Sequence, residues 1–206
     1  MEENENVEVN ETPINDGASE NNEKNGSKKA LIIGIVVVVI VAIVLFNIFG
    51  NTKGKAKGVV KDFVKAMNSL NAKKMMSCVD PYGAQVFSEL DEEDYEDFWD
   101  EYKDYLKSDD YEDFKEEYEE EKDDQLDDLQ DMFDEQKEEI KDDDIDYSVK
   151  IKEFKSVKKV GKNLYKVKAK ISMQYDDDKD SKTMEFYVMK KGLSCYIVGG
   201  DYSSLL

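Results

Sequence analysis

The chain has 206 residues, of which 38% are charged, and its formal net charge is −20 at pH 7. Every cationic side chain is a lysine. The absence of arginine removes the planar fork that recognises phosphates and bases, and the absence of histidine removes the usual neutral-pH proton shuttle and the commonest metal ligand. With so acidic a balance, nucleic acid is excluded from the expected partners.

The negative charge is concentrated in one block. Residues 1–29 contain eight acids and three lysines, a net charge of −5. Residues 89–146 contain 32 acids and six lysines, a net charge of −26, so the rest of the chain carries +11. The first 29 residues are rich in Glu and Asn and nearly free of large apolar groups, which predicts a disordered acidic tail.

Residues 30–50 form an apolar run in which Asn47 is the only clearly polar side chain. As a helix, such a run spans about 30 Å, the thickness of the hydrocarbon core of a bilayer. We therefore predict a transmembrane helix, and an uncleaved anchor rather than a signal peptide, because a long acidic segment precedes it. The lysines expected to reach the lipid headgroups on its two sides are Lys28 and Lys29, and Lys53, Lys55 and Lys57.

After the anchor, residues 51–57 are interpreted as a short basic linker and residues 58–206 as one folded domain. From Gly58 the apolar residues recur at helical spacing, at Val60, Phe63, Val64 and Met67. Asn71 is the expected N-cap of a second short helix, which Asp80-Pro81 closes.

The acidic block at 89–146 contains two series of apolar and aromatic residues at spacings of three and four. They predict two amphipathic helices of roughly 17 and 30 residues, the second interrupted around 119–124. Like charges four residues apart destabilise a helix. Burial of the aromatic stripes must therefore offset the repulsion, and we expect these stripes to pack on the rest of the domain or on a partner.

From Tyr147 the apolar period changes to two, which is typical of strands with one buried face. Turns are expected at residues 161–163, 176–182 and 191–192, giving four strands in an antiparallel meander. Helices followed by strands indicate an α+β domain, with helices packed on a four-stranded antiparallel sheet and residues 89–146 as an acidic helical insertion.

This order of elements resembles the nuclear transport factor 2-like (cystatin-like) domains. The segment VVKDFVKAMNSLNAKKMMSCVDP is similar to their opening helix pair. NLYKVKAKISMQY and MEFYVMKKGLSCYIVGG are similar to their last strands. The acidic block departs from the family pattern, because it stands where smaller helices normally lie. The resemblance implies a bacterial membrane protein that carries such a domain, of unknown function, on one anchor.

Catalytic members of that fold use an acid and tyrosines in a pocket between helices and sheet, but no such acid can be singled out here. We expect no catalytic residues, no cofactor and no bound metal. The acidic runs at 142–146 and 176–180 invite a calcium interpretation. Neither has the glycine and distal Glu of an EF-hand loop at the proper spacing.

The two cysteines, Cys78 and Cys195, have two interpretations. Outside a cell they could form a disulfide; otherwise they are small buried apolar side chains, since each lies in an apolar context. Two thiols without histidine do not make a structural zinc site.

The side of the membrane is open to two arguments. Five lysines follow the anchor closely and three precede it, so the positive-inside rule read literally places the domain in the cytoplasm. Large domains, however, translocate with little regard to charge, and the resembling proteins carry the domain outside. We expect an extracytoplasmic domain.

The expected function is therefore a single-pass, membrane-anchored, non-catalytic binding or accessory domain. A basic protein or a cell-wall component is the expected partner of its acidic helices. The alternatives are a small-ligand or enzyme pocket in the cone of the fold, and a calcium-dependent acidic module.

Overall fold

The computed structural model describes residues 52–201. The acidic tail at 1–29, Lys28, Lys29 and the apolar run at 30–50 lie outside the described residues. Within residues 52–201, no helix is both long and apolar enough to cross a membrane.

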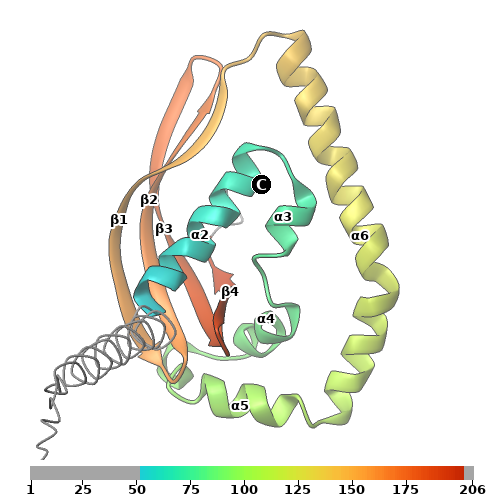
Figure 1. Cartoon of the computed structure of the whole chain (residues 1–206), viewed down its shortest axis with the longest axis vertical. Helices are drawn as coiled ribbons and strands as arrows, with labels where there is room; N and C mark the ends of the chain where they lie inside the picture. Colours follow the sequence, from blue (N-terminus) through green and yellow to red (C-terminus); the bar gives the residue numbers. More distant parts are fainter. Residues whose placement is uncertain (1–51, 202–206) are drawn as a thin grey trace, which may run out of the picture. The chain divides into compact units, whose positions relative to one another are not determined.

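The described part is an α+β domain with helices first and a four-stranded antiparallel sheet last, as predicted (Figure 1). In chain order the elements are α2 (Thr52–Asn68), α3 (Ala72–Met76), α4 (Pro81–Ser88), the 3-10 helix η2 (Glu92–Asp94), α5 (Phe98–Tyr105), α6 (Asp109–Asp142), β1 (Tyr147–Gly161), β2 (Leu164–Tyr175), β3 (Asp178–Lys191) and β4 (Ser194–Gly200).

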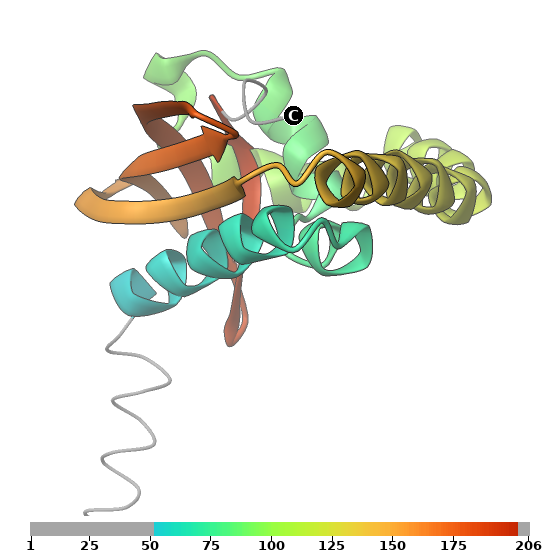
Figure 2. The same cartoon turned by 90° about the horizontal axis from the view of Figure 1, so that it is seen from above.

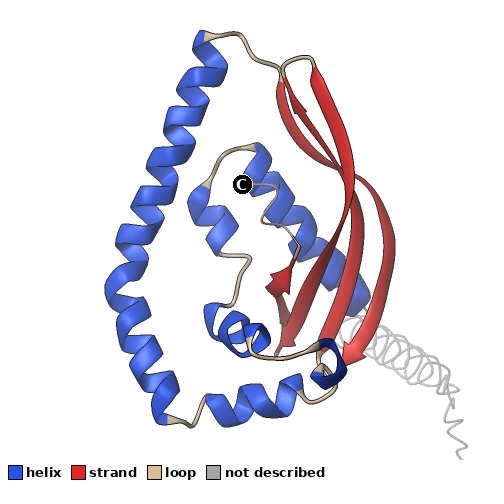
Figure 3. Cartoon of the chain, turned by 180° about the vertical axis from the view of Figure 1, so that it is seen from behind, coloured by secondary structure: helices blue, strands red, loops and turns tan. Residues whose placement is uncertain are grey.

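The sheet is a simple meander in the order β1-β2-β3-β4. Its first strand is long and irregular, with register shifts against β2 at Ile151/Glu153, Phe154/Ser156 and Lys159/Gly161. Such bulges increase the local bend and twist of a strand. The sheet accordingly curves, with its inner face toward α2 (Figure 3).

Helix α2 lies along the inner face of the sheet and supplies one side of the main core (Figure 2). Its buried stripe includes Val60, Phe63 and Met67, as the spacing predicted. These residues meet alternate side chains of β2 and β3, among them Val167 and Phe186, whose ring packs edge-on against Phe63 at 6.2 Å between centroids.

The predicted linker at 51–57 is wrong, because α2 begins at Thr52. Ala56 lies one turn before Val60 and is fully buried, so the apolar stripe starts earlier than the larger side chains reveal. Lysine and alanine are good helix formers and outweigh the one glycine in this stretch, Gly54.

The capping role of Asn71 is confirmed: its side chain accepts a hydrogen bond from the Lys74 N–H at 2.8 Å. A helix that sequence reasoning missed, α4, follows α3. Asp80-Pro81 both closes the preceding segment and opens α4, because Asp80 is its N-cap and Pro81 fits the first helical position.

Helices α4, η2 and α5 form a second core with one end of the sheet. The backbone of the sheet lies very close to these helices at two glycines. A Cβ on Gly161 would lie 1.9 Å from the Tyr95 carbonyl oxygen, and a Cβ on Gly199 would lie 2.2 Å from the Phe87 ring. The acidic block was expected to begin with one helix of roughly 17 residues. The structure has two shorter elements there, η2 and the eight-residue α5.

Two further boundaries differ from the prediction. Helix α6 continues for 34 residues without the interruption expected at 119–124, since that stretch contains no glycine or proline and its Glu and Lys residues favour helix. Residues 178–182, expected as part of a turn, belong to β3. Their backbone pairs with β2 as far as Tyr175↔Asp178, so the turn contains only two residues.

Candidate functional site

The most unusual surface of the domain is the helix α6, which we call the acidic arm. It has 34 residues, of which 19 are Asp or Glu and four are Lys, so its net charge is −15. Only one of its residues, Phe133, is buried. The arm runs from the end of α5 to the start of β1, on the side of α2 and α3 away from the sheet (Figure 1).

The first half of the arm is held by aromatic rings. Tyr82 of α4 lies between three rings of the arm, with centroid distances of 5.2 Å to Tyr111, 6.0 Å to Phe114 and 6.0 Å to Tyr118. Edge-to-face pairs of this kind add to the stabilisation that burial supplies. The predicted aromatic stripe therefore packs, in part, on the domain itself.

The second half of the arm is held by one polar and one apolar contact. The Gln130 side chain accepts a hydrogen bond from the Ala72 N–H at 3.1 Å, which satisfies a free donor at the start of α3. Phe133 enters the main core, and Leu126, Leu129 and Ile140 pack on its edge. Near the end of the arm, the Tyr175 hydroxyl donates to Glu139 at 2.9 Å.

The start of the arm suits its charge. Ser108 is the N-cap and accepts a hydrogen bond from the Tyr111 N–H at 3.2 Å, and the first turn contains Asp109, Asp110 and Glu112. Acids are favourable there because of the helix dipole. The ion pairs along the arm are exposed and three residues apart, so they contribute little to stability.

The outward side of the arm combines this charge with an apolar side chain. Met132 is 64% exposed, one of three large hydrophobic residues that are exposed in the described part of the chain. A surface of carboxylates around a flexible apolar side chain suits a partner with lysine or arginine and an apolar group. Sequence reasoning did not single out Met132.

A pocket of about 430 Å³ opens between the arm, the end of α2 and the far end of the sheet. Its apolar wall includes Met67, Phe133 and Met173, and its polar groups include Gln136 and Tyr175. The volume lies in the range of small-molecule sites.

The only buried acid among the described residues is Asp80, and both its carboxylate oxygens have partners. One accepts from the Gly83 N–H at 2.8 Å and the other from the Lys191 ammonium at 2.9 Å. Burial opposes the charge of Lys191, but Asp80 and the nearby Tyr102 outweigh this effect and raise the pKa of Lys191. Burial also raises the pKa of Tyr102.

This acid, lysine and tyrosine lie far apart in the sequence, and only the fold brings them together. The Tyr102 hydroxyl is buried and has no hydrogen-bond partner of good geometry within the described residues. The Lys191 ammonium lies 5.4 Å from the centre of the Tyr102 ring. Because Asp80 caps α4 and pairs with Lys191, its carboxylate is committed to structural bonds, and the cluster joins α4, α5 and β3.

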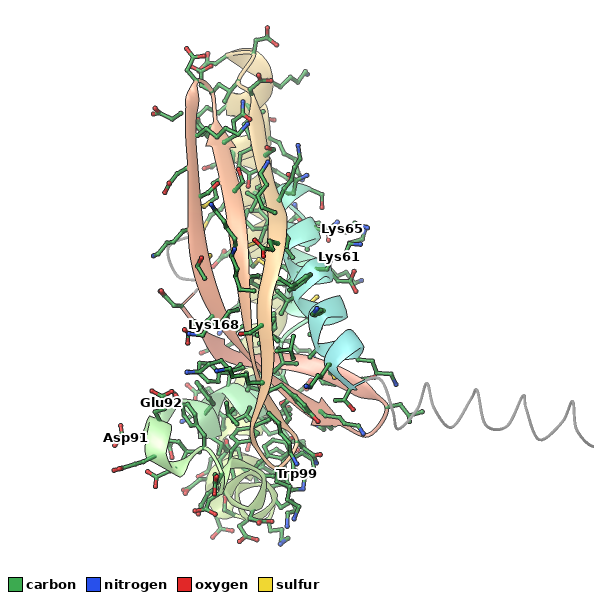
Figure 4. All side chains as sticks on the ribbon, turned by 90° about the vertical axis from the view of Figure 1, so that its left-hand side faces the viewer. Lys61, Lys65, Asp91, Glu92, Trp99 and Lys168 are labelled. Atoms are coloured by element: carbon green, nitrogen blue, oxygen red, sulfur yellow. The ribbon has the colours of Figure 1, made fainter. Side chains whose placement is uncertain are left out.

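The outer face of the sheet carries lysines that sequence reasoning did not single out (Figure 4). Lys166 is the best partnered of them: its ammonium lies 2.7 Å from Glu92, 3.2 Å from Glu185 and 5.0 Å from the centre of the Tyr187 ring. Hydrogen bonds from Lys168 and Lys166 hold the pKa of Glu185 below its ordinary value. The lysines of β2 alternate with apolar residues in the sequence. This pattern could have shown that they lie on the outer face, because the apolar residues between them enter the core.

Cys78 and Cys195 both line one groove beside α2 and β4, and both thiols are free. The Cys78 carbonyl accepts a hydrogen bond from the Ile197 N–H at 2.8 Å, two residues beyond Cys195. Burial raises the pKa of both thiols, so neither is an activated nucleophile.

Of the predicted membrane-flanking lysines, Lys53, Lys55 and Lys57 lie in the first turns of α2.

The two acidic runs meet at the far end of the sheet, where the Asp176 N–H donates to the Asp146 carbonyl at 3.0 Å. Within residues 52–201, no group of three or more acidic, Cys or His side chains is arranged to hold a metal ion.

Comparison of the chain with protein families, with curated proteins and with solved structures found no match, so the resemblance to the nuclear transport factor 2-like domains stays a prediction.

Proposed function

We propose that this chain is a single-pass membrane protein whose α+β domain binds a basic protein partner through the acidic arm, without catalysis. One observation carries the proposal: a 34-residue helix with net charge −15 keeps only one residue buried and leaves its carboxylates and Met132 exposed. Such a surface steers a basic partner and offers it an apolar contact.

Two further observations support it. The described residues offer no free buried acid for general acid–base chemistry, because the Asp80 carboxylate is bonded to Gly83 and Lys191. The arm is also held at several separate points, by the rings around Tyr82 and by Gln130 and Phe133, so its charges are presented on a fixed support. A rigid surface loses less entropy on binding than a flexible one.

The membrane part of the proposal rests on residues 30–50, whose length and apolarity suit one bilayer span. We place the domain outside the cytoplasm. Protease treatment of intact cells that carry a C-terminal tag tests this placement. Loss of the tag before lysis supports it, and survival of the tag until lysis refutes it.

The binding surface is tested by photo-crosslinking in cells, with a photoreactive phenylalanine at Met132 on the arm and, as a control, at Lys170 on the outer face of the sheet. The proposal expects a discrete crosslinked protein of basic composition from Met132 alone. Replacement of Glu116, Glu117, Glu120 and Asp128 by their amides should abolish that product. Amide replacement of four acids outside the arm, at Glu93, Asp94, Glu96 and Glu101, should preserve it. Equal loss in both sets would refute the assignment to the arm.

A second candidate function is favoured by the pocket beneath the arm. Its apolar wall and few polar groups suit a small apolar ligand with one hydrogen-bonding group. Native mass spectrometry of the full chain, extracted gently from its own membranes, would show such a ligand as a fixed added mass. Met173→Trp, which fills the pocket, should remove that mass, and an unmodified mass in the wild type would exclude this candidate.

A further inference from the structure

The turn between β3 and β4 exposes a large apolar side chain at its tip. Leu193 is 60% exposed, and Gly192, with φ of +60°, forms the turn beside it. The turn projects past α2 (Figure 2). An exposed leucine at the tip of a hairpin contributes nothing to the core of its own domain.

This tip is fastened to the first turn of α2. The Lys55 ammonium donates to the Leu193 carbonyl at 2.9 Å. Lys55 and Lys190 both lie close enough to Cys195 to lower its pKa against the effect of burial. Lys53 and Lys57 are exposed on the same turns of α2. The tip is therefore joined to the lysine-bearing first turns of α2, and Lys190 lies three residues before Leu193 in the chain.

The two chain segments that meet at the tip are basic, and the acid that lines the groove beside Leu193 is Asp62, further along α2. No acid occurs between Thr52 and Lys61, and none between Phe186 and Gly200. This contrasts with the acidic arm of the same domain. A mainly basic surface with an apolar tip matches an anionic lipid surface, where lysines meet phosphate groups and a leucine enters the boundary between headgroups and acyl chains.

The position of the tip along the chain places it near such a surface. The apolar run ends at Gly50, five residues before Lys55. Even a fully extended chain spans at most about 18 Å over five residues, and a helix only about 8 Å. If residues 30–50 span a bilayer, Lys55 and the turn bonded to it lie at or next to the lipid headgroups.

We infer that the β3–β4 turn and the first turns of α2 form a membrane-contact surface, in which Leu193 enters the lipid interface and Lys53, Lys55, Lys57 and Lys190 contact anionic headgroups. The inference rests on the proposed membrane anchor. It adds that the domain is docked on the bilayer rather than tethered loosely above it. A soluble polyanion offers no apolar phase for Leu193, so the lipid surface is the partner that uses both features.

The test uses the full chain in vesicles of phosphatidylcholine alone or with phosphatidylglycerol. Cys78 and Cys195 are first replaced by serine, and Leu193→Cys then carries an environment-sensitive nitrobenzoxadiazole dye. Met132→Cys is the matched control, since Met132 is equally exposed but lies on the acidic arm. Because both leaflets have the same composition, the direction of insertion does not matter.

Docking predicts a several-fold higher dye emission at Leu193 in the anionic vesicles, quenched by spin-labelled lipid, and unchanged emission at Met132. Glutamine at Lys53, Lys55, Lys57 and Lys190 should abolish the rise. Glutamine at four lysines of the far end of the sheet, Lys150, Lys152, Lys170 and Lys179, should preserve it. Emission at Leu193 as low as at Met132 in both lipids would overturn the docking.

Alkaline extraction of the same vesicles separates this result from the anchor. A chain that resists extraction while its Leu193 dye stays in water retains the anchor and refutes only the docking. A chain that is released by extraction refutes the anchor, and the docking with it.

Discussion

The bond pattern of Asp80 predicts a measurable loss of stability on its removal. Its side chain is 6% exposed, caps α4 through the Gly83 N–H and pairs with Lys191. Loss of an N-cap costs about 1 kcal/mol. The Lys191 side chain is 43% exposed and can regain water, so its lost partner adds only about 1 kcal/mol. Asp80→Ala should therefore lower the free energy of unfolding by about 2 kcal/mol.

Asp80→Asn separates the two contributions, because asparagine caps a helix as well as aspartate does but carries no charge. Asp80→Asn should therefore lower the free energy of unfolding by about half as much as Asp80→Ala does. Thermal unfolding of the full chain in detergent, followed by circular dichroism, is the assay; for a domain of this size the alanine variant should melt about 4–8 °C lower.

The control is Asp91→Ala, since Asp91 precedes η2 without a side-chain hydrogen bond and is exposed. Its melting temperature should match the wild type. Equal melting of the Asp80→Ala variant and the wild type, or equal losses for alanine and asparagine at position 80, would refute the reasoning.

Three further predictions follow from single residues. Gly58→Ala should stabilise the domain by about 0.5–1 kcal/mol in urea unfolding, because the position is helical and nothing lies within 4 Å of the added Cβ. Gly199→Ala should destabilise it by about 1–3 kcal/mol in the same assay, since its Cβ would meet the Phe87 ring; a neutral result would show that the ring can move. Glu185 has a folded-state pKa below its unfolded value, so it stabilises the domain above the unfolded pKa and this contribution is lost as the pH falls through the folded pKa. Acid titration should therefore unfold the wild type more steeply than Glu185→Gln, and parallel curves would contradict the assigned ion pairs with Lys166 and Lys168.

Local patterns in the sequence were sufficient for much of this domain. The three-and-four spacing of Val60, Phe63 and Met67 predicted α2, and alternation from Tyr147 predicted the strands and their meander. The cap at Asn71 is a local interaction over three residues and was also predictable. These features depend on neighbours within one helical turn or one hairpin, so their signal is present in the linear order of residues.

Other features depend on contacts between distant segments. The apolar spacing alone could not set the length of α6 or the early start of α2, because Ala56 and Phe133 gain their burial from packing. The pairing of Asp80 with Lys191 joins residues 111 positions apart, and the bond from Lys55 to Leu193 spans 138.

The same holds for the surfaces. The sequence by itself determined that one block of the chain is strongly acidic and that residues 30–50 are apolar enough for a bilayer. Only the tertiary structure decided that residues 109–142 of the acidic block form one long arm, that Met132 is exposed on it, and that Leu193 is bonded to Lys55 of α2. Charge and hydropathy are properties of residues, whereas a surface exists only once the chain has brought distant residues side by side.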